Sequence, residues 1–138
     1  MTVPAVLFVC VKNGGKSQMA AGLMRKAVGD SVEVHSAGTK PSGTVNALSA
    51  EALLEVGVDV SGEAPKPIDP ALLARMDYVV TLGSEASVEP VHGPTFENWN
   101  TDEPSERGID GIERMRLVRD DIASRVEELA SRMRSASS

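Results

Sequence analysis

The stretch "CVKNGGKSQM" (residues 10–19) combines a nucleophile, a cation and a glycine-rich loop. Gly14 and Gly15 permit unusual backbone angles, so several backbone N–H groups of the loop can point at one spot. Lys16 adds a positive charge, and Ser17 adds a hydroxyl donor. Between a strand and a helix N-terminus, such a loop predicts a cradle for an anion of phosphate size.

Cys10 would lie at the lip of this cradle. A free cysteine at the end of a buried strand is often a small core residue, which is the structural alternative. The donors and charge of the loop instead favour a thiolate that faces the bound anion. We therefore predict that Cys10 is a nucleophile directed at a tetrahedral oxyanion.

A nucleotide-binding loop is another interpretation of this stretch. The pattern G-x-x-x-x-G-K-[ST] would fit Gly15, Lys16 and Ser17 if position 10 were glycine, but that position holds the only cysteine. Nucleotide-hydrolysing enzymes also bind magnesium through an acidic residue at the end of a second apolar strand. Here Asp77 precedes its strand, which ends in "TLGS". Both features count against a nucleotide site.

Apolar strand patterns and helical patterns alternate along the chain. Strands are expected at 5–9, 31–36, 77–82 and 95–99, and helices at 17–28, 47–56, from residue 70 and at 109–133. This alternation predicts an α/β fold, a doubly wound and mainly parallel four-stranded sheet flanked by helices. Residues 1–134 are expected to form a single domain, followed by a disordered tail at 135–138. Ligands of such sheets bind at the carboxyl ends of the strands, where the first strand delivers Cys10.

The bulk composition limits the classes of partner. A net charge of −6 argues against nucleic acid or an anionic membrane. One cysteine excludes an internal disulfide and suits a reducing cytoplasm. The N-terminal apolar run is too short to span a bilayer and does not resemble a signal peptide. We expect a cytoplasmic protein without a metal site, because one cysteine and two histidines lack metal-ligand spacing.

Five collinear stretches then carry a family resemblance: "VLFVCVKNGGKSQMAAGLMR", "SAGTKP", "VNALSAEALLEVGVDVSG", "PKPIDPALLARMDYVVTLG" and "NWNTDEPSERG". They extend from Val6 to the final helix. In these stretches the chain resembles the low-molecular-weight tyrosine phosphatases and the arsenate reductases that share their fold. The resemblance implies a low-molecular-weight phosphatase-like fold for the whole domain.

The resemblance also implies roles for individual residues. Cys10, held as a thiolate by the loop and by Ser17, would attack the bound oxyanion, and Asn13 would brace the loop. An acid beside Pro104 would protonate the leaving oxygen; Glu103 precedes the proline and Asp102 is next to it, so either could donate unless both are merely solvated. The implied catalytic residues are Cys10, Lys16, Ser17, Asp102 and Glu103, and the implied oxyanion-binding residues are Lys12, Asn13, Gly14, Gly15, Lys16 and Ser17.

Three departures from the family pattern bear on the reaction. The residue before Pro104 is Glu103, which is one methylene longer than the aspartate of the family. Lys16 stands where the C-x5-R signature has arginine, so a point charge replaces a planar fork. Thioredoxin-coupled reductases carry relay cysteines after the third strand, where this chain has Gly83. The resemblance is therefore closest to the single-cysteine actinobacterial reductases that transfer arsenic to mycothiol and rely on mycoredoxin. It implies arsenate as substrate, phosphate or sulfate as analogues, and no tightly bound cofactor.

Two other functions stay open. A phosphotyrosine phosphatase needs aromatic walls, and only Trp99 is expected near the mouth of the site. A non-catalytic oxyanion-binding protein would use Lys16 for binding alone, although Cys10 and the acid pair count against it. The arginines after the acid motif are expected mostly on a solvated face, with Arg107 close enough to approach an anion; they are Arg107, Arg114, Arg116 and Arg119.

Overall fold

The computed structural model describes residues 3–137, and the side chains of residues 3–134. One sheet contains β1 (Ala5–Cys10), β2 (Glu33–Gly38), β3 (Tyr78–Leu82) and β4 (Thr95–Trp99) in the order β2-β1-β3-β4. All adjacent strands are parallel, which confirms the predicted α/β fold and its four-stranded sheet. Every strand therefore ends at the same edge, where Cys10 pairs with Gly38.

The helices are α1 (Lys16–Val28), α2 (Ala47–Leu54), α3 (Pro70–Ala74) and α4 (Gly111–Ser137), with short 3-10 turns at Gly29–Ser31 and Pro104–Arg107. The carboxamide oxygen of Asn46 caps α2 by accepting from the N–H of Ser49. Asp69 caps α3 in the same way, ahead of a proline at the first helical position. Of the tail expected at 135–138, residues 135–137 belong to α4 and Ser138 lies outside the described residues. No described helix is long and apolar enough to cross a membrane.

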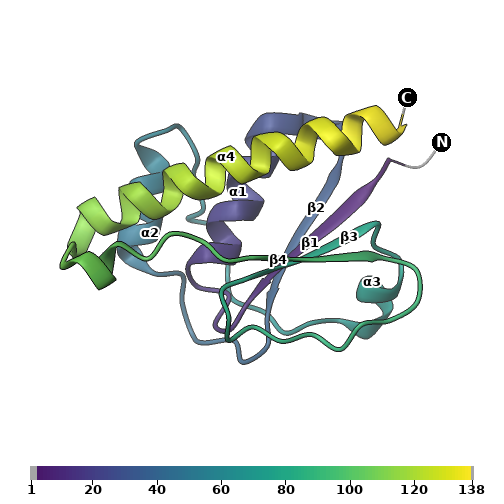
Figure 1. Cartoon of the computed structure of the whole chain (residues 1–138), viewed down its shortest axis with the longest axis horizontal. Helices are drawn as coiled ribbons and strands as arrows, with labels where there is room; N and C mark the ends of the chain where they lie inside the picture. The colour runs from purple at the N-terminus through teal and green to yellow at the C-terminus, as the bar shows by residue number, and fades with distance from the viewer. Residues whose placement is uncertain (1–2, 138) are drawn as a thin grey trace.

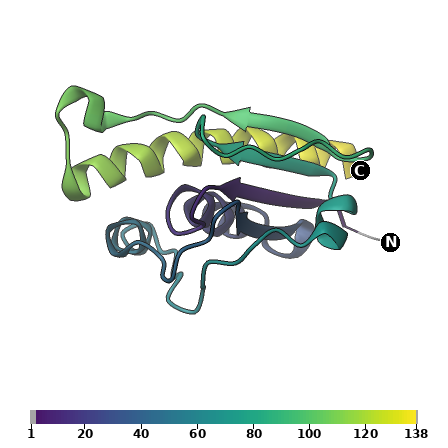
Figure 2. The same cartoon turned by 90° about the horizontal axis from the view of Figure 1, so that it is seen from below.

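The two faces of the sheet have separate apolar cores. Alternate residues of β1 point to opposite faces, so Phe8 packs with α1, α2 and α4 while Leu7 packs with α3. Figure 1 shows α4 running the length of the molecule, and α4 packs against both α1 and α2. In both views α2 and α3 lie at opposite ends of the molecule (Figures 1 and 2). The loop after Cys10 lies near the starts of α2 and α4, because Gly15 lines one cavity together with Ser49 and Arg114.

Candidate active site

Several carbonyl groups of the loop between β1 and α1 accept hydrogen bonds from a neighbouring segment of the chain. Backbone N–H groups of the segment after β2 donate to them, from Lys40 to Val11 (2.7 Å), Ser42 to Lys12 (3.1 Å) and Asn46 to Gly14 (2.6 Å). Within residues 3–137, the backbone N–H groups of residue 12 and of residues 14–17 have no protein acceptor. They belong to the loop and to the first turn of α1, where unpaired donors and the helix dipole favour an anion.

The sulfur of Cys10 forms hydrogen bonds with two groups of the loop and of α1. The N–H of Asn13 donates to Cys10 Sγ over 3.2 Å, and Ser17 Oγ lies 2.9 Å from the same sulfur. Ser17 Oγ already accepts from the Asn13 carboxamide at 2.7 Å. When Cys10 is a thiolate its sulfur can only accept, so the Ser17 hydroxyl then donates to it and stabilises the negative charge.

Asn13 fixes the conformation of the loop through its backbone angles and its hydrogen bonds. Its φ of 53° is in the left-handed region, which asparagine tolerates better than most residues. Its carboxamide oxygen accepts from the backbone N–H of Lys66 at 3.0 Å, and its carbonyl accepts from the Gln18 carboxamide at 3.1 Å. Two separate parts of the chain, at Gln18 and at Lys66, thus hold Asn13, whose carboxamide in turn donates to the hydroxyl of Ser17.

Gly38, at the end of β2, allows the loop to approach the sheet edge closely. A side-chain carbon at this position would come within 2.7 Å of the carbonyl oxygen of Val11 and 2.9 Å of the backbone nitrogen of Asn13. Both contacts are with backbone atoms, which cannot rotate away. Gly38 is therefore required for the position of the loop that carries Cys10.

Two cations surround the carboxylate of Glu103. Lys16 Nζ lies 2.8 Å from Glu103 Oε1, and Arg114 Nη2 lies 3.0 Å from Glu103 Oε2. Hydrogen bonding to Lys16, and then to Arg114, lowers the pKa of Glu103 to about 2 although burial opposes the shift. Without a bound anion, Glu103 is ionised at neutral pH and offsets one of the two positive charges of Lys16 and Arg114.

Asp102 points to a different partner. Its carboxylate forms two hydrogen bonds with the guanidinium of Arg107, at 2.8 and 3.1 Å, which lower its pKa. Arg107, which the sequence suggested could approach an anion, is thus engaged by Asp102. Of the two candidate acids, Glu103 is the one that faces the loop of Cys10.

A cavity of about 550 Å³, here called the reaction pocket, lies above Cys10 at the carboxyl edge of the sheet. Lys16, Glu103 and Arg114 line it, together with residues 83–86. No aromatic side chain belongs to its lining. Trp99 was expected near the mouth, and this is wrong: it is 5% exposed and its ring packs against Phe8 at 5.6 Å between centroids.

Most of the sequence-predicted site residues meet at this pocket. Cys10, Lys12, Gly15, Lys16 and Glu103 line it, whereas Gly14 borders a neighbouring cavity, Asn13 and Ser17 are buried in the loop, and Asp102 lies outside the lining. Arg114, expected on a solvated face, is the main residue that sequence reasoning missed. In the described part of the chain, no group of acidic, histidine or cysteine side chains is placed to bind a metal ion.

The parallel four-stranded sheet and the loop between Cys10 and Ser17 are features of one protein family. The chain belongs to the low molecular weight phosphotyrosine protein phosphatase family, whose profile matches residues 5–138. Within that family it is 36% identical over 135 residues to arsenate reductase 2 of Staphylococcus epidermidis, covering 96% of this chain and 100% of that protein.

Solved structures of arsenate reductases have the same architecture. An arsenate reductase in the phosphate binding state superposes with a TM-score of 0.83 at 30% identity, covering 95% of this chain and 99% of that one. The thioredoxin-dependent arsenate reductase Cg_ArsC1' of Corynebacterium glutamicum has a TM-score of 0.82 at 34% identity. That match covers 97% of this chain but 63% of the other, which is therefore considerably longer.

Proposed function

We propose that this protein is an arsenate reductase in which Cys10 attacks bound arsenate and an external low-molecular-weight thiol takes over the arsenic. The observation that carries the proposal is the sulfur of Cys10, which accepts from Asn13 N–H and lies 2.9 Å from the Ser17 hydroxyl beneath an anion cradle. The family membership and the arsenate reductases among its relatives support the choice of anion.

The first step binds arsenate in the cradle. The free backbone N–H groups of residue 12 and of residues 14–17 receive its oxygens, while Lys16 and Arg114 supply positive charge. The anion displaces the Glu103 carboxylate from these two cations. The sulfur of Cys10 then forms a bond to arsenic, and one arsenate oxygen leaves as water after protonation.

Glu103 is the proposed proton donor for that oxygen. It lines the reaction pocket, whereas Asp102 is bound to Arg107. When the dianion replaces Glu103 at Lys16 and Arg114, the carboxylate loses its stabilising partners and faces negative charge. Both changes raise its pKa toward the range in which a carboxyl group can donate a proton.

The second step needs a thiol from outside this sequence, because Cys10 is its only cysteine. The external thiolate attacks arsenic, and Cys10 leaves with its electron pair as a thiolate. A further thiol then attacks the sulfur of the released arsenic adduct and forms a disulfide, and the two electrons reduce As(V) to arsenite. We propose mycothiol as the first thiol and mycoredoxin as the reductant of the resulting disulfide, with no tightly bound cofactor.

The absence of a second cysteine from this sequence supports an external thiol. Thioredoxin would instead need an internal disulfide to reduce. Gly83 lines the reaction pocket where the thioredoxin-coupled enzymes of the resemblance carry a relay cysteine. Residues 83–86, "GSEA", contain no thiol. A reduced Cys10 is also needed in each cycle, and a reducing cytoplasm would maintain it.

Phosphatase activity is the competing function, since the family is named for it. An aryl phosphate would need a hydrophobic surface for its ring, and the lining of the reaction pocket has no aromatic side chain. The pocket suits a small inorganic oxyanion better.

The Cys10→Ser variant tests the proposal. It keeps the cradle, so arsenate binding measured by calorimetry is expected to stay within about threefold of wild type, whereas thiol-dependent arsenite release disappears. Arsenite release by the variant at a wild-type rate would overturn the role of Cys10. Loss of function without loss of binding also distinguishes an enzyme from a protein that only binds oxyanions.

A further inference from the structure

Two buried side-chain groups in the lining of the reaction pocket have no hydrogen-bond partner among the described residues. They are the hydroxyl of Thr101 and the Nε of Arg114. The side chain of Thr101 belongs to a residue that is 6% exposed, so bulk water does not replace the missing partner. Burial of a polar group without a partner is costly, and such a group commonly marks the place of a ligand or of a bound water.

The segment that follows β4 directs Thr101 toward the pocket. Thr101 and Glu103 both line the reaction pocket, whereas Asp102 between them lies outside the lining and pairs with Arg107. Side chains two residues apart in an extended segment lie on the same side of it, and the neighbour between them lies on the other. The backbone N–H of Asp102 donates to the carboxylate of Asp121 on α4 at 2.8 Å, which holds the segment in this orientation.

We propose that Thr101 is a further ligand of the bound oxyanion, and that its hydroxyl donates to the oxygen that leaves during the reaction. The inference rests on the proposed function and deepens it. Attack by the sulfur of Cys10 in line with the departing oxygen places that oxygen on the far side of arsenic from the sulfur. The backbone N–H groups of the loop hold the other oxygens, so the departing one points into the reaction pocket.

The electrons and protons of this step balance within the site. The departing oxygen is the hydroxyl of hydrogen arsenate. Its As–O bond breaks with the electron pair going to oxygen, while the thiolate of Cys10 supplies the pair for the new As–Sγ bond. The proton of Glu103 completes the water molecule that leaves, and arsenic stays As(V). A hydrogen bond from Thr101 becomes stronger as negative charge develops on the departing oxygen, which stabilises the transition state.

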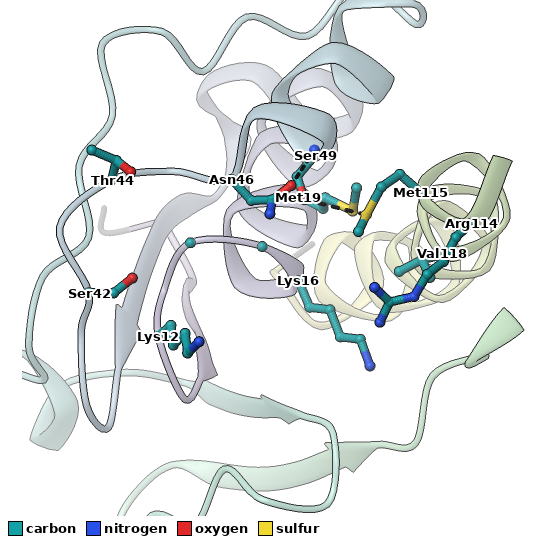
Figure 3. Close-up of a pocket in the computed structure, with 12 residues that line it drawn as sticks. Lys12, Lys16, Met19, Ser42, Thr44, Asn46, Ser49, Arg114, Met115 and Val118 are labelled. Carbon is teal, nitrogen blue, oxygen red and sulfur yellow. Dashed lines mark hydrogen bonds between the residues drawn. The ribbon is translucent and has the colours of Figure 1, made fainter. Parts of the chain in front are cut away.

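The chemistry of the two unpartnered groups favours an anionic ligand. The Nε of Arg114 can only donate a hydrogen bond, and the hydroxyl of Thr101 can donate one, so a ligand that satisfies both must present acceptors. Lys16 and Arg114 extend into the space between the loop and α4 (Figure 3), where their charges attract an anion. A rotation about the Cα–Cβ bond exchanges the hydroxyl and the methyl group of Thr101, so the hydroxyl can turn to the cavity that this residue lines.

A second buried threonine provides a matched control. Thr81 in β3 is 8% exposed and lies outside the lining of the reaction pocket. Its hydroxyl accepts from the Asn98 carboxamide at 2.8 Å and donates to the carbonyl of Glu97 at 3.4 Å. Valine resembles threonine in shape but has no hydroxyl, so Thr81→Val breaks two hydrogen bonds of the folded protein. Thr101→Val breaks none in the absence of a ligand.

Thermal unfolding without an anion and calorimetry with arsenate test the proposal. Thr101→Val is expected to raise the midpoint of unfolding, because it removes an unsatisfied buried group, whereas Thr81→Val lowers the midpoint. Calorimetry uses Cys10→Ser as the parent of every variant, so that no As–S bond forms. In this background Thr101→Val is expected to raise the Kd for arsenate about tenfold, as loss of a hydrogen bond to a charged group does. Thr101→Ser, which keeps the hydroxyl, and Thr81→Val should stay within about threefold of the parent.

An arsenate Kd of Thr101→Val within about twofold of its parent would overturn the inference. A lower unfolding midpoint of Thr101→Val that Thr101→Ser restores would also overturn it, because that result would assign the hydroxyl a structural role. With Cys10 present, kcat/KM for arsenate is expected to fall at least about tenfold in Thr101→Val. Absence of arsenite release with every thiol would sink the proposed function alone, since the calorimetric comparison still decides whether Thr101 contacts the bound oxyanion.

Discussion

Lys16 Nζ and Glu103 Oε1 are 2.8 Å apart, so the cation that replaces the arginine of the family signature is held by an ion pair across the reaction pocket. Arg114 contacts the other oxygen of the same carboxylate. The site therefore contains a guanidinium after all, supplied by α4 instead of by the loop. In the proposed function, Lys16 and Arg114 together provide the charge that the loop arginine of the family signature carries.

Replacement of Lys16 by arginine tests whether Lys16 and Arg114 together bind arsenate as well as a loop arginine would. A guanidinium on the loop could grip two arsenate oxygens, so the Kd for arsenate is expected to fall about fivefold, the effect of roughly one further hydrogen bond. Calorimetry on Lys16→Arg and on Lys16→Met as the charge-free control measures this. An unchanged Kd in Lys16→Arg would mean that the guanidinium of Arg114 already occupies the place that a guanidinium at position 16 would take.

Substitution of Glu103 and substitution of Asp102 should have different effects on kcat for arsenate reduction. Because Glu103 faces the pocket, Glu103→Gln is expected to lower kcat for arsenate reduction about a hundredfold, as loss of a proton donor does. The KM for arsenate should not rise, because the carboxylate that competes for Lys16 and Arg114 is gone. Asp102→Asn is the matched control and should leave kcat within about threefold. A larger loss of kcat in Asp102→Asn would assign the proton donor to Asp102.

Glu103 also makes the fold sensitive to acid. Its pKa in the folded protein is about 2, below its ordinary value of 4.5, so the ionised form favours the folded state. This contribution is complete above pH 4.5 and is lost as the pH falls toward 2. Urea unfolding at pH 7 and pH 3 is therefore expected to show a smaller loss of stability in Glu103→Gln than in wild type. An equal loss in the two proteins would show that the ion pairs with Lys16 and Arg114 do not stabilise the fold.

Gly38→Ala should displace the loop that follows Cys10. The added carbon would meet backbone atoms of Val11 and Asn13, so we expect a destabilisation of about 1–3 kcal/mol together with reduced arsenate turnover. Gly43→Ala is the control, because a carbon there meets nothing within 4 Å. Thermal unfolding and turnover of the two variants provide the comparison. Equal behaviour of Gly38→Ala and Gly43→Ala would contradict the close approach.

The chemistry of the loop could be predicted from sequence because it is local. Cys10, Lys16 and Ser17 are close in the chain, and a strand followed by a glycine-rich turn and a helix fixes their relative positions. The parallel sheet was predictable for a similar reason, since its two central strands, β1 and β3, are short apolar runs that alternate with helical patterns. The order of the strands and the packing of α4 on α1 and α2 depend on contacts between distant segments.

The remaining parts of the site depend on such distant contacts. Arg114 is one of several arginines in a helix with an apolar stripe, and no local pattern distinguishes the one that reaches the pocket. The roles of Glu103 and Asp102 depend on side-chain direction, which is set by their partners Lys16 and Arg107. Trp99 was misplaced because a lone aromatic residue in a polar segment gives no sign that its ring belongs to the core.

Arsenite release under three thiol conditions, beside hydrolysis of an aryl phosphate, tests the central claim most directly. Wild-type protein is given arsenate with mycothiol and mycoredoxin, with thioredoxin alone, or with no thiol. We expect arsenite with mycothiol and mycoredoxin, none with thioredoxin alone, and slow aryl phosphate hydrolysis. Rapid aryl phosphate hydrolysis without thiol-dependent arsenite release would contradict the assignment as a reductase, and full turnover with thioredoxin alone would contradict the external low-molecular-weight thiol.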